Sequence, residues 1–126
     1  MSLSVSMFAL LVRDYDEAIA YYTKVLGFPL IEDTKQSQTK RWVVIGAGSV
    51  RLLLAKAKNE QEAARVGDQT GGRVFLFVDT DNFDADYARL KGAGVDFIGA
   101  PRLEPFGKVV VFRDLYGNQW DLVERR

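Results

Sequence analysis

Hydrophobic and polar positions along this chain change between a two-residue period and a helical period, in an order that occurs twice. In the first half, alternation predicts a strand over residues 4–13 and helical spacing predicts an amphipathic helix over residues 15–26. Asp14 and Glu17 form a capping pair at the start of this helix, and Gly27 fits its end. Three shorter strands are expected at residues 28–32, 41–45 and 50–55, with a polar loop over residues 33–40.

The second half begins the same order again. A strand is expected over residues 73–78, followed by a helix that Asp81 or Asn82 caps and that places Phe83, Tyr87 and Leu90 on one face. Further strands are expected over residues 95–98, 109–112 and 119–124, with a loop over residues 100–107. Alternation in the last strand places Trp120 under the helix, in the core.

The pattern therefore predicts an α+β fold built from two tandem βαβββ modules. They would form cupped, mixed β-sheets with the helices on the outer face. We expect one domain over residues 1–126, with module one at about 4–55, a charged connection at about 56–72 and module two at about 73–126.

Asp121 is the unusual position of this pattern, because it places a carboxylate in the middle of an otherwise apolar strand. A buried charge is costly unless it is paired or bound to a metal. Asp121 should therefore have a partner.

Composition removes several kinds of site. Lysine and arginine together number 17, as do aspartate and glutamate, so the net charge is zero and favours neither nucleic acid nor an anionic membrane as partner. With no cysteine and no histidine, thiolate nucleophiles, disulfides and the commonest transition-metal ligands are excluded. No apolar run has membrane-spanning length and no signal-peptide pattern is present, which indicates a cytoplasmic protein.

Three segments, LLVRDYDEAIAYYTKVLGF, RVFLFVDTDNFDADYARLKGAGVDF and VVVFRDLYGNQWDL, resemble the vicinal-oxygen-chelate superfamily. This group includes glyoxalase I, bleomycin-resistance proteins and extradiol dioxygenases. The resemblance covers nearly the whole chain, in order, and implies the fold derived above. It says less about function, since one scaffold supports many chemistries.

In metal-dependent members, the ligands come from the first and last strands of each module. The resemblance places Met7, Arg51, Arg73 and Asp121 at these four positions. Only Asp121 keeps ligand chemistry, because a thioether is a poor ligand for hard cations and a guanidinium repels them. We therefore expect neither a metal nor another cofactor.

The same alignment implies a small-molecule cavity that is mostly apolar, with a few polar groups. Its candidate ligand-binding residues are Met7, Trp42, Arg51, Arg73, Phe75, Gln119 and Asp121. An ion pair of Asp121 with Arg51 or Arg73 would be structural; alternatively, the surplus guanidinium binds a ligand carboxylate or phosphate. Asp121 as general base is a weaker catalytic candidate.

Three functions remain open from the sequence. The first is a metal-independent protein that binds or sequesters an apolar or aromatic ligand with an anionic group, as a homodimer like many similar proteins. The second is an enzyme of the lyase, isomerase or dioxygenase type, with Glu104 or Glu124 helping Asp121 to hold a metal. The third is a scaffold or assembly domain whose cavity is closed by ion pairs.

Overall fold

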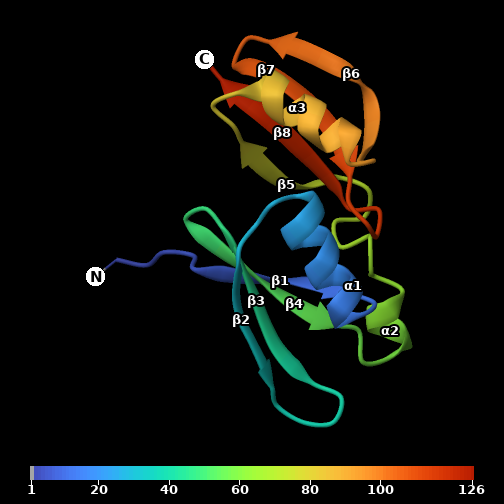
Figure 1. The fold of residues 1–126 in the computed structure, drawn as a ribbon. Helices are drawn as coiled ribbons and strands as arrows, with labels where there is room; N and C mark the ends of the chain where they lie inside the picture. The colour runs from blue at the N-terminus through green and yellow to red at the C-terminus, as the bar shows by residue number, and fades with distance from the viewer. Residues whose placement is uncertain (1) are drawn as a thin grey trace. The chain divides into compact units, whose positions relative to one another are not determined.

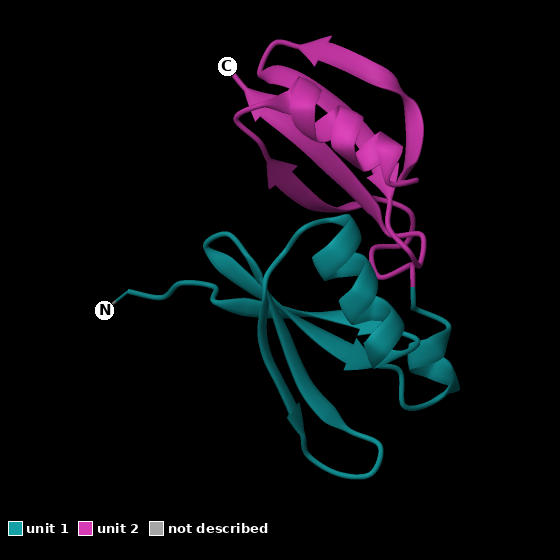
Figure 2. Cartoon of the chain, in the orientation of Figure 1, with its two compact units in different colours: residues 1–66 teal, residues 67–126 magenta. Residues whose placement is uncertain are grey.

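The computed structural model describes residues 2–126, which form two compact units. Unit 1 ends at Val66, and unit 2 runs from Gly67 to Arg126 (Figure 2). The boundary falls inside the segment that the sequence assigns to the connection between the two modules.

Unit 1 is a four-stranded mixed sheet with helices (Figure 1). Its strands follow the order β1-β4-β3-β2, in which β1 and β4 run parallel and the other pairs are antiparallel. The elements are β1 (Met7–Val12), α1 (Tyr15–Ala20), the π-helical turn η1 (Tyr21–Val25), β2 (Leu30–Lys35), β3 (Arg41–Ala47), β4 (Val50–Lys56) and α2 (Glu60–Ala63).

Unit 2 repeats this arrangement, with strand order β5-β8-β7-β6 and a parallel β5–β8 pair. The elements are β5 (Val74–Asp79), α3 (Phe83–Gly92), β6 (Asp96–Glu104), β7 (Gly107–Arg113) and β8 (Gln119–Arg125). Two four-stranded mixed sheets of equal topology confirm the predicted α+β fold of two tandem modules. Among residues 2–126, no helix is long and apolar enough to cross a bilayer.

One face of the unit 1 sheet packs under α1, and the strand alternation decides which residues it buries (Figure 1). The Asp14 side chain caps α1 by accepting a hydrogen bond from the Glu17 N–H at 2.9 Å, as the capping pair predicts. After η1 the chain turns at Gly27, whose φ of 90° suits glycine. The fully buried strand residues are Leu10, Val12, Val43, Ile45 and Leu54.

The core of unit 2 lies between α3 and its sheet, and its centre is the stacked pair of Trp120 and Phe112. Trp120 is 2% exposed, which confirms its predicted place in the core. Its indole Nε1 donates to Oδ2 of Asp114 at 3.0 Å, so the turn before β8 is tied to the core. Asn82 caps α3 by accepting from the N–H of Ala85.

Two predicted loops are wrong in part, because both contain strand residues. Residues 33–35 belong to β2, an exposed edge strand whose polar side chains hid its pairing with β3. Residues 100–104 belong to β6, although Gly99 and Pro101 are typical loop residues. The register against β7 shifts between Ile98 and Arg102, and such an irregularity accommodates both of these residues within a strand.

Candidate functional site

The sheet of unit 1 opens into a fork between β3 and β4. Their ladder runs from the Ala47–Val50 pair to the Val43–Leu54 pair and ends there. Beyond it, β3 continues to Arg41 paired only with β2, while β4 continues to Lys56 paired only with β1. Beyond this pair the two strands diverge, and residues of both line the space at the open end of the sheet.

A cavity of about 720 Å³ occupies this fork. Trp42 of β3 and Leu53 and Ala55 of β4 supply its apolar wall. The hydroxyl-bearing Ser37 and Thr39 line it from the turn between β2 and β3. Small-molecule sites commonly measure about 300–1,000 Å³ and combine an apolar wall with a few polar groups. The size and lining of this cavity therefore suit a small organic ligand.

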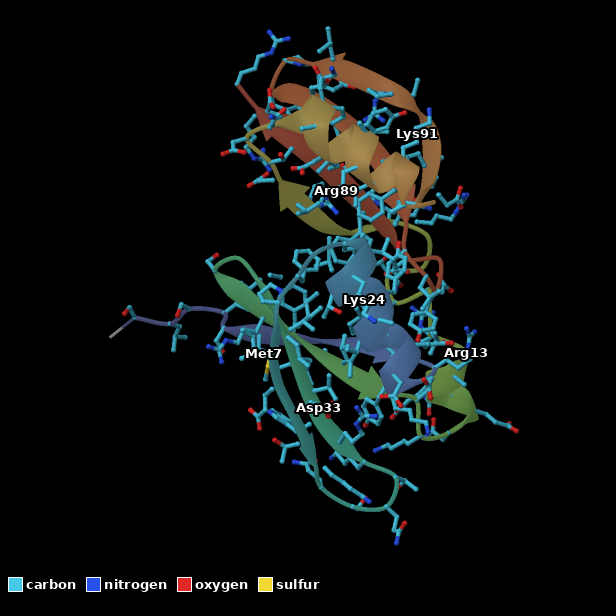
Figure 3. All side chains as sticks on the ribbon, viewed as in Figure 1. Met7, Arg13, Lys24, Asp33, Arg89 and Lys91 are labelled. Carbon is cyan, nitrogen blue, oxygen red and sulfur yellow. The ribbon has the colours of Figure 1, made fainter. Side chains whose placement is uncertain are left out.

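Tyr15 and Arg41 form a fixed wall of the cavity. The Tyr15 hydroxyl accepts a hydrogen bond from the Arg41 backbone N–H at 3.2 Å, and the guanidinium lies over the Tyr15 ring, 5.2 Å from its centroid. The guanidinium donates to both carboxylate oxygens of Asp33, at 3.1 and 2.7 Å, and to Oδ1 of Asp16 at 2.9 Å. Figure 3 labels Asp33 on β2, from where it reaches Arg41.

These hydrogen bonds hold the charges of the Arg41 cluster in place. The bond from Arg41 lowers the pKa of Asp33, against the opposing effect of burial. The two aspartates, Asp33 first, raise the pKa of Arg41. Three of the five N–H donors of Arg41 meet these two carboxylates, whose combined charge exceeds that of the guanidinium, so Arg41 offers a ligand anion no net positive charge.

The remaining charges of the cavity favour anions. Lys58 and Glu62 neutralise each other, with Nζ and Oε2 3.8 Å apart. Lys40 and Lys56 also line the cavity, and neither ammonium meets a carboxylate among residues 2–126. The cavity thus carries two lysines whose charge is not balanced by a direct partner.

The candidate residues of unit 1 divide between the two ends of its sheet. Trp42 lines the cavity at the fork. Met7 and Arg51 are register partners on β1 and β4, at the other end of these strands, where Arg51 also faces Gly46 of β3. Figure 3 labels Met7 at the start of β1. The structure therefore brings Met7 together with Arg51, but not with Trp42.

In unit 2, Asp121 lies on the sheet face opposite α3. Its register partners are Phe77 on β5 and Val111 on β7, so its neighbours across the sheet are apolar. Its Oδ1 atom is buried and has no hydrogen-bond partner among the described residues. Burial raises the pKa of Asp121, and the charge of Arg102 opposes this effect.

The candidate residues around Asp121 are affected by a bulge in β5. Val74 pairs with Gln119 and Leu76 with Trp120, so Phe75 is an extra residue between the two pairs. Gln119 shares the face of Asp121 by alternation. The resemblance implies that Arg73 and Phe75 belong to the same cavity as Asp121, but the bulge interrupts the alternation that would keep them on that face. Arg73 makes no ion pair with Asp121 within the part of the chain that is described.

The residues near Asp121 do not fit a metal ion. Phe77 and Val111 have no donor atoms, and Arg102 is a cation that pairs with Glu104 at 3.1 Å. Oε1 of Glu124 accepts the Phe83 N–H at 2.7 Å at the start of α3, and alternation places this side chain on the other face from Asp121. A single carboxylate is too small a donor set for a divalent cation.

Three residues of these sites were missed in the sequence. Arg102 was assigned to a loop, whereas the register of β6 places it opposite Val109 on the face of Asp121. Lys40 and Lys56 looked like ordinary surface charges. Both lysines can be read in the sequence, but no sequence signal shows where β3 and β4 separate. That separation is what brings Lys40 and Lys56 to one cavity.

Comparison with known proteins agrees with the fold. An uncharacterized protein from Shewanella frigidimarina is 49% identical over 128 residues, covering 98% of this chain and 95% of that protein. The crystal structure of UcmS2 has a TM-score of 0.84 at 32% identity and covers 98% of both chains. TnmS3, an antibiotic binding protein from Streptomyces sp. CB03234, has a TM-score of 0.78 at 28% identity and covers 100% of this chain and 99% of that one.

The match to a protein family is equally extensive. Residues 4–122 match the model of the Glyoxalase/Bleomycin resistance protein/Dioxygenase superfamily, and this span includes all eight strands except the end of β8. The similarity expected from the three sequence segments is confirmed. The chain belongs to the Glyoxalase/Bleomycin resistance protein/Dioxygenase superfamily.

Proposed function

We propose that this protein binds, and thereby sequesters, an apolar or aromatic small molecule that carries an anionic group. The observation that carries the proposal is the cavity of about 720 Å³ at the fork of β3 and β4. Trp42 offers an aromatic face for stacking, and the lysines offer positive charge. Met7, Arg51, Arg73, Phe75, Gln119 and Asp121 stay in the proposal as further candidate contacts.

The relatives support a binding role. TnmS3 is an antibiotic binding protein, and it shares the fold along the whole length of this chain. A cavity with an apolar wall and a charged rim suits a small molecule that combines an apolar body with polar groups. We therefore place natural-product antibiotics first among the ligands to test.

We further propose that binding needs no metal. The support is the chemistry of the donors: the chain has neither histidine nor cysteine, and Asp121 stands among apolar neighbours and Arg102. The alternative, a lyase, isomerase or dioxygenase with an atypical metal site, would need Glu104 or Glu124 beside Asp121. Both glutamates are engaged elsewhere, with Arg102 and with the start of α3.

A thermal-shift screen tests the binding proposal, because a ligand of the native state raises the melting temperature. The panel contains aromatic carboxylates and sulfonates, antibiotics with aromatic ring systems, and aliphatic amines. We expect aromatic acids to stabilise the wild type, and Trp42→Ala to remove this effect. Phe106→Ala, which truncates an aromatic side chain that is 49% exposed outside the cavity, is the matched control.

Metal content is measured on protein purified without chelator. Less than a tenth of an equivalent of any transition metal, and unchanged ligand affinity in EDTA, would agree with the proposal. One bound equivalent, or binding that EDTA abolishes, would contradict it.

We also propose a homodimer. The support is that large apolar side chains on the strands of unit 2 are exposed: Phe77 on β5 is 63% and Leu103 on β6 is 74% exposed. Sedimentation of the wild type and of Phe77→Ser compares the two assembly states. A wild type that sediments as a monomer at all concentrations would refute this part of the proposal.

A further inference from the structure

Some of the cations at the fork of β3 and β4 are paired with carboxylates, and only the others are available to a ligand. Arg41 is held by Asp33 and Asp16 and is part of the wall. Lys58 is beside Glu62, whose Oε1 also accepts the Lys58 N–H at 3.1 Å. The available charge is therefore that of Lys40 and Lys56.

Lys40 and Lys56 reach the cavity from the two sides of the fork. Lys40 ends the turn that precedes β3, and Lys56 is the last residue of β4. The strands that carry them have stopped pairing with each other. Because both residues line the same cavity, an anion bound there can attract both ammonium groups, each of which is a point charge with rotatable donors.

Hydroxyl groups add donors at the same place. Ser37 Oγ accepts from the N–H groups of Thr39 and Lys40, at 3.3 and 3.1 Å, which fixes the turn. Within residues 2–126 no acceptor is assigned to the hydroxyl hydrogens of Ser37 and Thr39. Both can donate to an oxyanion that the lysines attract.

Trp42 is the residue of the apolar wall that lies nearest in the chain to this polar mouth. It follows Arg41 on β3, it is half-buried, and it lines the cavity together with Leu53. An aromatic ring is large enough to contact the indole and the leucine while its substituent remains at the mouth. The aromatic part of a ligand would therefore lie on Trp42 and Leu53, and its anionic group would lie at the mouth.

Resting on the proposed function, we propose that the fork selects aromatic oxyanions, sulfonates and carboxylates, and that Lys40 and Lys56 together read the charge. The aromatic ring packs on Trp42 and the oxyanion lies between the two ammonium groups. Arg51 and Arg73, the cations expected from the sequence, do not carry this selectivity. A neutral ligand of the same shape keeps the ring contact and loses the charge contact.

The test uses naphthalenesulfonate and its neutral isostere naphthalenesulfonamide as probes, with binding followed by isothermal titration at neutral pH. The wild type should prefer the sulfonate by about tenfold, because each of two solvent-exposed ion pairs contributes a few-fold in affinity. Lys40→Met/Lys56→Met should remove this preference and leave sulfonamide affinity within about twofold. Added salt should weaken only sulfonate binding.

A matched control removes the same total charge outside the cavity. Lys24→Met/Lys35→Met changes two exposed lysines of unit 1, of which Lys24 on η1 is labelled in Figure 3. The preference of this control should equal that of the wild type. An equal loss of the sulfonate preference in both double variants would show that the net charge of the protein, and not the fork, determines this preference.

The outcomes separate this inference from the function on which it rests. If both probes bind the wild type with equal affinity and Trp42→Ala abolishes both, the cavity binds ligands but the lysines do not select anions, and the inference is overturned. If the preference survives in Lys40→Met/Lys56→Met and disappears in Arg51→Met or Arg73→Met, the inference is overturned in favour of those residues. If neither probe nor any screened ligand binds, the proposed function fails as well.

Discussion

The hydroxyl of Tyr15 accepts the backbone N–H of Arg41 at 3.2 Å, beside the point where β3 and β4 separate. Tyr15 is the first residue of α1 and is 7% exposed. The β3–β4 ladder has ended at Val43, so the hydroxyl gives this N–H an acceptor at the open end of the sheet. The first turn of α1 thereby stabilises the fork in which the cavity lies.

Tyr15→Phe should destabilise unit 1, because the Arg41 N–H loses its acceptor at a half-buried position. The expected loss in the free energy of unfolding is about 1–2 kcal/mol, which urea titration measures. Tyr87→Phe is the control, since the Tyr87 hydroxyl has no hydrogen-bond partner in the described part of the chain. Equal stabilities of the two variants would contradict a role for the Tyr15 hydroxyl.

Asp33→Asn should reduce stability at neutral pH and leave it unchanged in acid. The pKa of Asp33 is lowered by its hydrogen bond from Arg41, so its contribution is present above the unfolded pKa of 3.8 and is lost as the pH falls through the folded pKa. The loss should not exceed about 1 kcal/mol, because the pair is partly exposed.

Urea titrations at a series of pH values check this dependence. Glu32→Gln removes the neighbouring carboxylate of β2, which accepts a hydrogen bond from Thr34 but forms no ion pair among residues 2–126. The Asp33 variant should therefore lose more stability than the Glu32 variant at neutral pH. A pH-independent difference would show that the Arg41 pair is not its cause.

Local signals in the sequence were sufficient for the fold. Asp14, Asn82 and Gly27 act within a few residues, and alternation describes each strand by itself. Trp120 could be assigned to the core because its strand is regular from Gln119 to Arg125. Duplication of the pattern then fixed the order of the elements in both units.

The sites depend on relations between strands, which one sequence does not contain. The fork exists because β3 and β4 stop pairing after Val43 and Leu54, and no residue type announces this. The extra residue in β5 likewise interrupts the alternation that would keep Phe75 on the face of Asp121. Arg102 was missed because a strand with Gly99 and Pro101 resembles a loop.

Asp114→Ala should severely destabilise unit 2. The Asp114 carboxylate is 6% exposed and accepts from the backbone N–H groups of Tyr116 and Asn118, both at 3.0 Å, and from the indole of Trp120. Removing it leaves several buried donors unpaired, at a cost of about 3 kcal/mol or more in the free energy of unfolding.

Urea unfolding followed by tryptophan fluorescence measures this loss, and Asp114→Asn keeps one acceptor oxygen if the alanine variant does not fold. The asparagine variant should retain part of the stability. Asp81→Ala, which truncates an exposed aspartate before α3, is the control and should change stability by less than about 0.5 kcal/mol. A loss as small for Asp114→Ala would show that its hydrogen bonds are not needed.

Asp121→Asn should stabilise the protein at neutral pH, which is the opposite of the usual effect of removing a buried group. Burial raises the pKa of Asp121, although the charge of Arg102 opposes this shift. The folded protein therefore binds a proton at Asp121 more readily than the unfolded chain does. The stability that this proton confers is complete below the unfolded pKa of 3.8 and is lost as the pH rises through the folded pKa. At neutral pH the asparagine variant should therefore be more stable by about 1 kcal/mol, and the difference should disappear in acid.

Urea titration across this pH range measures the difference in the free energy of unfolding, and Asp96→Asn is an exposed control on β6. A variant less stable than the wild type at neutral pH would mean that the ionised carboxylate of Asp121 has a partner that compensates its burial.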